Sequence, residues 1–188
     1  MEQENASFMK PAITSGVYLG LIGILISVII WAGGLMESMG IWGSALIGIF
    51  NFVITFLLIF FFSKSYRNKF RGGFISFKDI FIYSLIMVIA SVVIGAIYNL
   101  VFFTLIDPGY TERLMGVMQQ KTITYMERVG APESQINKTM EKFSEVPSTA
   151  KSIINGLVGG LIIGAILALI SSAFVKKNPD IESENAYR

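Results

Sequence analysis

The sequence contains neither cysteine nor histidine. It therefore forms no disulfide and offers no thiolate or imidazole ligand for zinc, haem iron or an iron–sulfur cluster. The commonest general acid–base of enzymes is missing as well, because that role falls most often to histidine. No aspartate lies in the apolar segments, so the parts of an intramembrane protease are also absent. We expect no catalytic residue, no cofactor site and no metal site.

Charge is scarce and unevenly distributed. Only 15% of the 188 residues are charged and 53% are apolar, whereas about a quarter of a soluble domain is charged. Four stretches hold no charged residue at all: 12–36, 41–63, 80–106 and 153–175. Each exceeds the roughly 20 residues that cross a bilayer, where only a helix satisfies its own backbone. The sequence predicts an all-α, integral membrane four-helix bundle forming a single membrane domain over 1–188.

The first stretch has a second interpretation, as a cleaved signal peptide ending near Ala32–Gly34. Its apolar run is longer than the roughly 7–15 residues of a signal peptide's hydrophobic region. The preceding segment carries Glu2 and Glu4 against a single Lys10. We therefore expect this stretch to remain in the protein as a transmembrane helix.

Basic residues indicate an orientation. The connection 64–79 has one acid, Asp79, and five basic residues: Lys64, Arg67, Lys69, Arg71 and Lys78. Lys10 precedes the first span and Lys176–Lys177 follow the last, whereas the connection 107–152 has six basic and six acidic residues. The positive-inside rule then places both termini and the basic connection in the cytoplasm. Trp31 and Trp42 would lie at the outer interface.

The basic connection has two interpretations. Gly72–Gly73 could bring backbone N–H groups close to a phosphate or an anionic lipid, or the segment is a topology signal with a turn. We favour the second, because no Gly-x-x-x-x-Gly-Lys-Ser/Thr motif is present. Ser76 and Asp79 fit a capping box that opens the third helix. A formal net charge of only +2 gives no indication of a nucleic-acid partner.

Small residues recur along two of the predicted helices. The fourth has one at every fourth position, and the first has a shorter version: Gly156, Gly160, Gly164, Ala168 and Ser172, then Gly16 and Gly20. Such a stripe lets another helix backbone approach closely, which is how membrane helices associate. The contact lies within one chain or between two chains, and we favour the first.

Two amides lie within charge-free segments, Asn51 and Asn99. Because an amide facing lipid is costly, we expect each to point inward, with Thr55 and Ser91 as candidate partners. The alternative is a polar site within a permeation path. No ionisable residue accompanies them, so proton relays and voltage sensing are not indicated.

The segment 107–152 is expected to lie outside the cell. Asp107–Pro108 fits an N-cap followed by proline at the first helical position, and Gly130 fits a C-terminal stop. Apolar residues at helical spacing on either side of Gly130 predict an extracytoplasmic amphipathic helical hairpin between the third and fourth transmembrane helices. It either binds a partner or packs as a lid on its own bundle, and we favour the lid.

Several short stretches resemble a family catalogued as domain of unknown function 4199, found mainly in Bacteroidetes. They are Lys-Ser-Tyr-Arg-Asn-Lys at 64–69, Gly-Gly-Phe-Ile-Ser-Phe at 72–77, Asp-Pro-Gly-Tyr at 107–110, and the fourth span followed by Lys-Lys. The resemblance covers roughly 12–178 and is most specific from Lys64 to Tyr110. It implies four spans and a location in the bacterial inner membrane. The segment before the last span has fewer acids and more Thr and Ser than is usual in the family. No activity is implied.

The expected function is that of a multi-pass membrane protein which is not an enzyme. The glycine stripes and the amphipathic segment favour an interaction or scaffold protein. Its partners would be the lipid bilayer and either further copies of the chain or another membrane protein, with no nucleic acid. The alternative is a small transporter or channel subunit with a polar seam near Asn51 and Asn99.

Overall fold

The computed structural model describes residues 2–39, 41–143 and 148–178. Within these ranges nearly all of the chain is helical, and extended pairing is limited to one backbone bridge between Ile75 and Lys177. The helices are α1 (Glu2–Ala32), α2 (Leu35–Ser38), α3 (Ile41–Phe70), α4 (Phe77–Val101), the π-helical turn η1 (Phe102–Ile106), α5 (Tyr110–Arg128), α6 (Glu133–Phe143) and α7 (Thr149–Val175).

Four helical segments are long and apolar enough to cross a membrane. They are Phe8–Ala32, Trp42–Phe70, Phe77–Ile106 and Thr149–Val175, where the third combines α4 with η1. Large apolar side chains are exposed along them, among them Leu105 at 77% and Phe174 at 71%. Lipid is the solvent that covers such a surface. The chain is a multi-pass membrane protein, as its four charge-free stretches predict.

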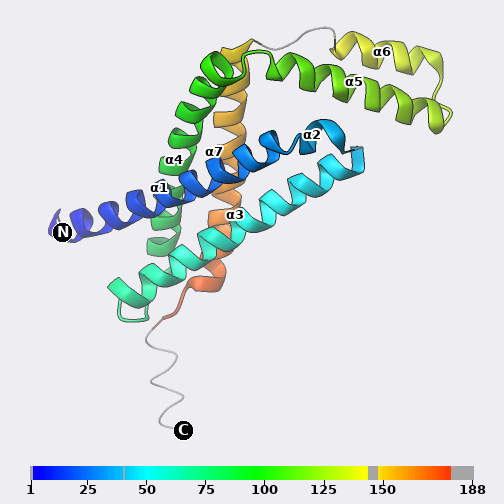
Figure 1. Cartoon of the computed structure of the whole chain (residues 1–188). Helices are drawn as coiled ribbons and strands as arrows, with labels where there is room; N and C mark the ends of the chain where they lie inside the picture. Colours follow the sequence, from blue (N-terminus) through cyan, green and yellow to red (C-terminus); the bar gives the residue numbers. More distant parts are fainter. Residues whose placement is uncertain (1, 40, 144–147, 179–188) are drawn as a thin grey trace.

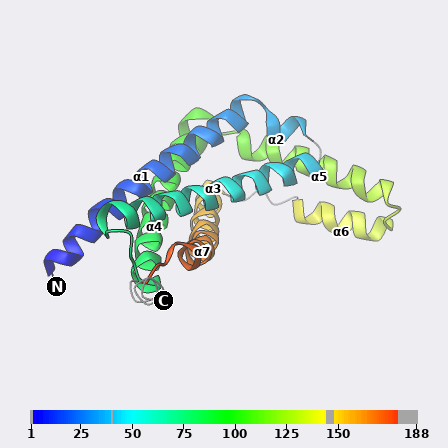
Figure 2. The ribbon, with the colours of Figure 1, turned by 90° about the horizontal axis from the view of Figure 1, so that it is seen from below.

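The spanning helices form two layers. Helices α4 and α7 lie side by side, and α1 and α3 run across them (Figure 1; Figure 2). Helix α4 is the centre of the packing, because α1 and α7 both rest on it, while α3 rests mainly on α7. Helices α1 and α3 touch one another little. A cleft between α1 and α3 results from this arrangement.

Two glycines set the distance between α1 and α4. A Cβ atom at Gly16 would lie 2.5 Å from the carbonyl oxygen of Met87 and 2.6 Å from the Cβ of Ala90. A Cβ at Gly20 would lie 3.0 Å from Ile94. Only glycine permits this approach of the two backbones.

The stripe of small residues on α7 comprises Gly156, Gly160, Gly164, Ala168 and Ser172. Its middle part faces α4, since a Cβ at Gly164 would overlap Val88 and one at Gly160 would lie 3.3 Å from Val92. Its last two members are 0% exposed and belong to the core, while its first has open space. The stripe is thus used within the chain over most of its length.

Several helix ends differ from the predicted spans. Helix α1 stops at Ala32 because Gly33 and Gly34 follow, and Gly34 takes a left-handed φ of 58°. Helix α3 continues two turns past residue 63 to Phe70, so Lys64, Arg67 and Lys69 are helical. Long basic side chains allow this, because their apolar stems lie along the helix while their charges reach water.

The basic connection is bound to the end of α7. The Arg67 guanidinium donates a hydrogen bond of 2.8 Å to the carbonyl oxygen of Val175 in the last turn of α7. Ile75 and Lys177 exchange two backbone hydrogen bonds of 2.9 and 3.0 Å. The Lys64 ammonium lies over the Phe60 ring. These contacts give the connection a structural role in the fold.

Ser76 begins α4 as the predicted capping residue. Its hydroxyl accepts a hydrogen bond from the backbone N–H of Asp79 at 3.2 Å and donates one to the Asp79 carboxylate at 2.8 Å. The first turn of α4 therefore has a side-chain acceptor for one of its free N–H groups.

Helices α5 and α6 follow η1, run side by side and extend away from the four spanning helices (Figure 1). Helix α5 ends just before Gly130, which has a φ of 71°. Its Lys121 ammonium donates hydrogen bonds to the carbonyl oxygens of Met36, at 3.1 Å, and Met39. Residues 144–147 of the predicted outer segment lie outside the described residues, and its last four residues, 149–152, form the first turn of α7.

The prediction that Asp107 caps α5 is wrong. The N-cap of α5 is Gly109, without a side-chain hydrogen bond. The Asp107 carboxylate instead accepts hydrogen bonds from the Arg113 guanidinium, at 2.6 and 2.9 Å, and from the indole N–H of Trp31 at 3.0 Å. A charged hydrogen-bond donor is a stronger partner than a backbone N–H. Asp107 thus joins α1 to α5.

This junction predicts an acid transition. The hydrogen bonds from Arg113, and secondarily from Trp31, lower the pKa of Asp107. Its carboxylate therefore stabilises the fold at neutral pH, and this contribution is lost as pH falls through the lowered folded-state pKa. In a Trp42→Phe variant, Trp31 emission should stay constant from neutral pH to about pH 4 and change only below it. Asp107→Asn should remove the transition, and a midpoint above pH 5 would contradict this reading.

Candidate functional site

Three cavities follow one another along the cleft between α1 and α3. We name them by their most polar members: the lysine cavity, the hydroxyl cavity and the amide cavity, with volumes of about 620, 250 and 290 Å³. The amide and hydroxyl cavities share Gly23, Ser27 and Asn99. Tyr18 belongs to the lysine cavity and its neighbour Leu19 to the hydroxyl cavity. The cleft is thus lined from one end of the bundle to the other.

The amide cavity brings the two predicted intramembrane amides together. Asn51 of α3 and Asn99 of α4 both line it, with Ser27 of α1 opposite them. Thr55 does not bind either amide and donates instead to the backbone carbonyl of Asn51 at 2.8 Å. Among the described residues no hydrogen bond satisfies either side-chain amide. These amides therefore face the cavity and not a protein partner.

The hydroxyl cavity continues this polar surface. Its lining includes Ser27, Thr55 and Ser91, one from each of α1, α3 and α4. Tyr98 also lines it, and its hydroxyl is buried with no hydrogen-bond partner in the described part of the chain. A buried polar group without a partner costs free energy. The amide and hydroxyl cavities together form one polar surface along the cleft.

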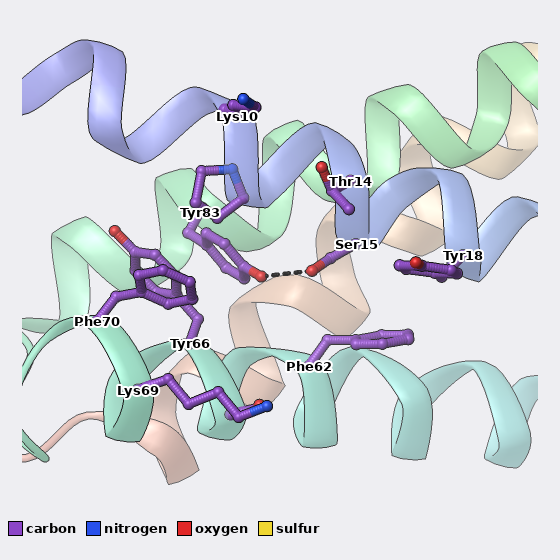
Figure 3. A pocket seen from close by; sticks show the side chains of 11 residues that line it. Lys10, Thr14, Ser15, Tyr18, Phe62, Tyr66, Lys69, Phe70 and Tyr83 are labelled. Atoms are coloured by element: carbon purple, nitrogen blue, oxygen red, sulfur yellow. Dashed lines mark hydrogen bonds between the residues drawn. The ribbon is translucent and has the colours of Figure 1, made fainter.

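The lysine cavity lies between the N-terminal part of α1 and the C-terminal part of α3 (Figure 3). Lys10 on α1 and Lys69 on α3 stand on opposite walls, and both side chains are exposed. At its floor the hydroxyl groups of Ser15 and Tyr83 share a hydrogen bond of 2.7 Å. The cavity is therefore charged at its mouth and uncharged at its floor.

Aromatic rings build that floor. Tyr66 and Tyr83 stack with their centroids 4.1 Å apart and their planes 13° from parallel. Phe70 stacks on the outer face of Tyr66 at 5.5 Å, and Phe8 meets both tyrosines edge-on. Tyr83 is 1% exposed and Tyr66 3%. This cluster fixes α1, α3 and α4 at one end of the bundle.

The three cavity linings contain hydroxyl groups with no carboxylate or imidazole beside them. Serines and threonines are present, but no acid lines any of the three cavities, and the chain has no histidine. A nucleophilic hydroxyl needs an adjacent base. Within the described residues no group of three or more Asp and Glu could hold a metal ion. The cleft can bind a molecule through hydrogen bonds, aromatic stacking and positive charge.

The sequence predicts a polar site at Asn51 and Asn99 but does not predict the lysine cavity. Its basic residues Lys10 and Lys69 were interpreted only as topology signals, and no role was predicted for Tyr66 and Tyr83. A signal existed in Ser15 and Tyr83, two hydroxyl groups within charge-free segments. Nothing in the sequence says, however, that residues 68 positions apart face each other.

Comparisons with known proteins give one match. A family described as "Protein of unknown function (DUF4199)" matches residues 14–177. No curated protein and no solved structure matches the chain. The matched region contains all three spans that line the cleft, except for the first turns of α1. Because the match covers most of the chain's length, this membrane protein belongs to the DUF4199 family.

Proposed function

We propose that this protein is a non-catalytic small transporter or channel subunit, whose polar seam between α1 and α3 holds a small neutral solute. One observation carries the proposal. Asn51 and Asn99 line joined cavities inside the membrane-spanning bundle, and neither side-chain amide has a protein partner among the described residues. Polar groups are costly at this depth, and membrane proteins keep them where they serve a pathway.

The polar seam comprises the amide and hydroxyl cavities, and its size and charge limit which solutes can bind there. The amide and hydroxyl cavities measure about 290 and 250 Å³, near the lower end of small-molecule sites. None of their lining residues is charged. A small solute with both hydrogen-bond donors and acceptors, such as a polyol or an amide, fits this lining.

The proposed membrane is the bacterial inner membrane, with both termini in the cytoplasm. Lys10, Lys69 and the Lys176–Lys177 segment gather at one end of the bundle, while α2 and α5 lie at the other. The positive-inside rule supports a cytoplasmic location for the first end. Helices α5 and α6 would then lie on the extracytoplasmic side.

Cysteine accessibility tests the seam, and the cysteine-free chain needs no background changes. A cysteine at Asn51 should react with a small charged thiosulfonate roughly tenfold or more faster than one at Phe50, because thiolate forms only where water reaches. Phe50 is the matched control at the same depth, since its side chain is 58% exposed on the lipid side. Equal rates at both positions would refute a water-filled seam.

Transport itself is measured by osmotic shrinkage of proteoliposomes in a graded series of polyols and amides. The chain should speed the entry of at least one small solute over protein-free liposomes. Asn51→Leu should abolish that increase while insertion and helicity stay normal. If no solute enters faster, the transport proposal fails.

A second candidate is an interaction or scaffold protein. Its supporting observation is that α5 and α6 extend past the spanning helices (Figure 2) and leave Met118, Tyr125, Val129 and Met140 exposed. A homo-oligomer or a complex with another membrane protein would use this pair of helices. The glycine stripes support such an assembly less, because α4 covers most of them within the chain.

A further inference from the structure

The lysine cavity has a charge pattern that the proposed transport does not use. Two of its eleven lining residues are lysines, and none is acidic. Its volume of about 620 Å³ lies within the range of small-molecule sites. It shares no lining residue with the amide and hydroxyl cavities.

Its depth places it where lipid head groups meet acyl chains. Lys10 lies in the first turn of the membrane-spanning part of α1, and Lys69 lies in the last turn of the membrane-spanning part of α3. Lysines at such positions extend their ammonium groups to the interface. The buried Tyr66–Tyr83 stack lies inward from them.

Like a phospholipid, the cavity therefore has a polar end and an apolar end. Two exposed ammonium groups stand at its mouth, hydroxyl groups from Thr14 and Ser65 lie on its walls, and aromatic rings close it below. A phosphate with an attached acyl chain matches each part: the phosphate meets the ammonium groups and the chain meets the rings. A free phosphate would leave the aromatic part of the cavity unmatched.

We propose that the lysine cavity is a binding site for one anionic glycerophospholipid, whose phosphate is held between Lys10 and Lys69 and whose acyl chain lies against Phe62 and Phe70. The lipid contacts both α1 and α3, at the end of the bundle where the aromatic cluster already joins them to α4. The proposal does not depend on transport, because the two sites have separate linings and separate variants.

The test is a lipid titration of the purified full-length chain in detergent, read by native mass spectrometry. The probes are phosphatidylglycerol, zwitterionic phosphatidylethanolamine and inorganic phosphate. We expect one saturable phosphatidylglycerol, weaker binding of phosphatidylethanolamine, and no displacement by excess phosphate. Each interfacial lysine contributes about fivefold to anionic-lipid affinity, so Lys10→Gln/Lys69→Gln should weaken binding by roughly thirtyfold.

The matched control is Lys64→Gln/Lys78→Gln, which removes the same charge at the same end of the bundle but outside the cavity lining. It should leave the affinity within about twofold of the wild type, since a lysine outside the site adds only screened attraction. A third variant, Thr14→Trp, fills the cavity with both lysines present and should also abolish binding. Circular dichroism confirms the fold of each variant.

Four results would overturn the proposal. An equal loss of affinity in the two double variants would indicate diffuse attraction. Equal binding of phosphatidylethanolamine, or displacement by inorganic phosphate, would show that the site does not select an anionic lipid. Normal binding by a folded Thr14→Trp variant would exclude the cavity itself as the site.

Discussion

Tyr83→Ala should lower the free energy of unfolding by about 3 kcal/mol or more. Tyr83 is 1% exposed, stacks on Tyr66 at 4.1 Å and shares a hydrogen bond with Ser15 at 2.7 Å. Alanine leaves a cavity where α1, α3 and α4 meet. Lipid offers less hydrophobic driving force than water, so most of the loss is lost packing. Denaturation of the detergent-solubilised protein by sodium dodecyl sulfate, followed by circular dichroism, measures it.

Tyr83→Phe is the control that separates packing from hydrogen bonding. It keeps the stack with Tyr66 and removes only the bond to Ser15. A hydrogen bond between membrane helices contributes about 0.6 kcal/mol on average and up to about 1.7 kcal/mol. Tyr83→Phe should therefore cost at most about half as much as Tyr83→Ala. If the two variants are equally stable, the aromatic cluster does not hold the bundle together.

Gly16→Ala should separate α1 from α4 and cost about 1–3 kcal/mol, the usual range for overpacking. The added Cβ would stand 2.5 Å from the carbonyl oxygen of Met87, and a backbone atom cannot move aside as a flexible side chain can. The whole of α1 must shift, together with the cleft that it lines. The same unfolding titration measures the loss of stability.

Gly23→Ala is the matched control on the same helix. A Cβ there meets nothing within 4 Å, so the substitution gains helix propensity of up to about 1 kcal/mol without a clash. Gly23→Ala should thus be neutral or stabilising. A loss of stability similar to that of Gly16→Ala would show that helix packing at Gly16 is not the cause.

The membrane solvent explains why the four spans could be predicted from the sequence. A charge-free stretch of more than 20 residues has few alternatives to a helix in lipid. The ends of the helices were less predictable. Helix α3 carries Lys64 and Lys69 on two additional turns, since basic side chains reach water from inside a helix. Helix α1 ends four residues before the predicted end of its span, at the Gly33–Gly34 pair.

The amide cavity could be predicted from the sequence, whereas the lysine cavity could not. Asn51 and Asn99 stand out because amides are rare and costly within a span, and both line the amide cavity. The lysine cavity depends on how α1 crosses α4, which brings Ser15 to Tyr83 across 68 residues of chain. Asp107 was assigned to the wrong partner for a local reason. Its local signal as a helix cap was weaker than the ion pair with Arg113.

The central position of α4 has a consequence for how the protein is made. Synthesis delivers α1 and α3 to the membrane first, and these two helices make few contacts with each other. Helix α4, on which α1 packs, is the third span to be made, and α7, on which α3 packs, is the last. Until α4 is inserted, α1 and α3 therefore remain in lipid or beside the insertion machinery, and Ser27 and Asn51 are not yet covered by α4. Assembly of this bundle is completed only at the end of translation, and a chain truncated before α7 would lack the helix on which α3 mainly rests.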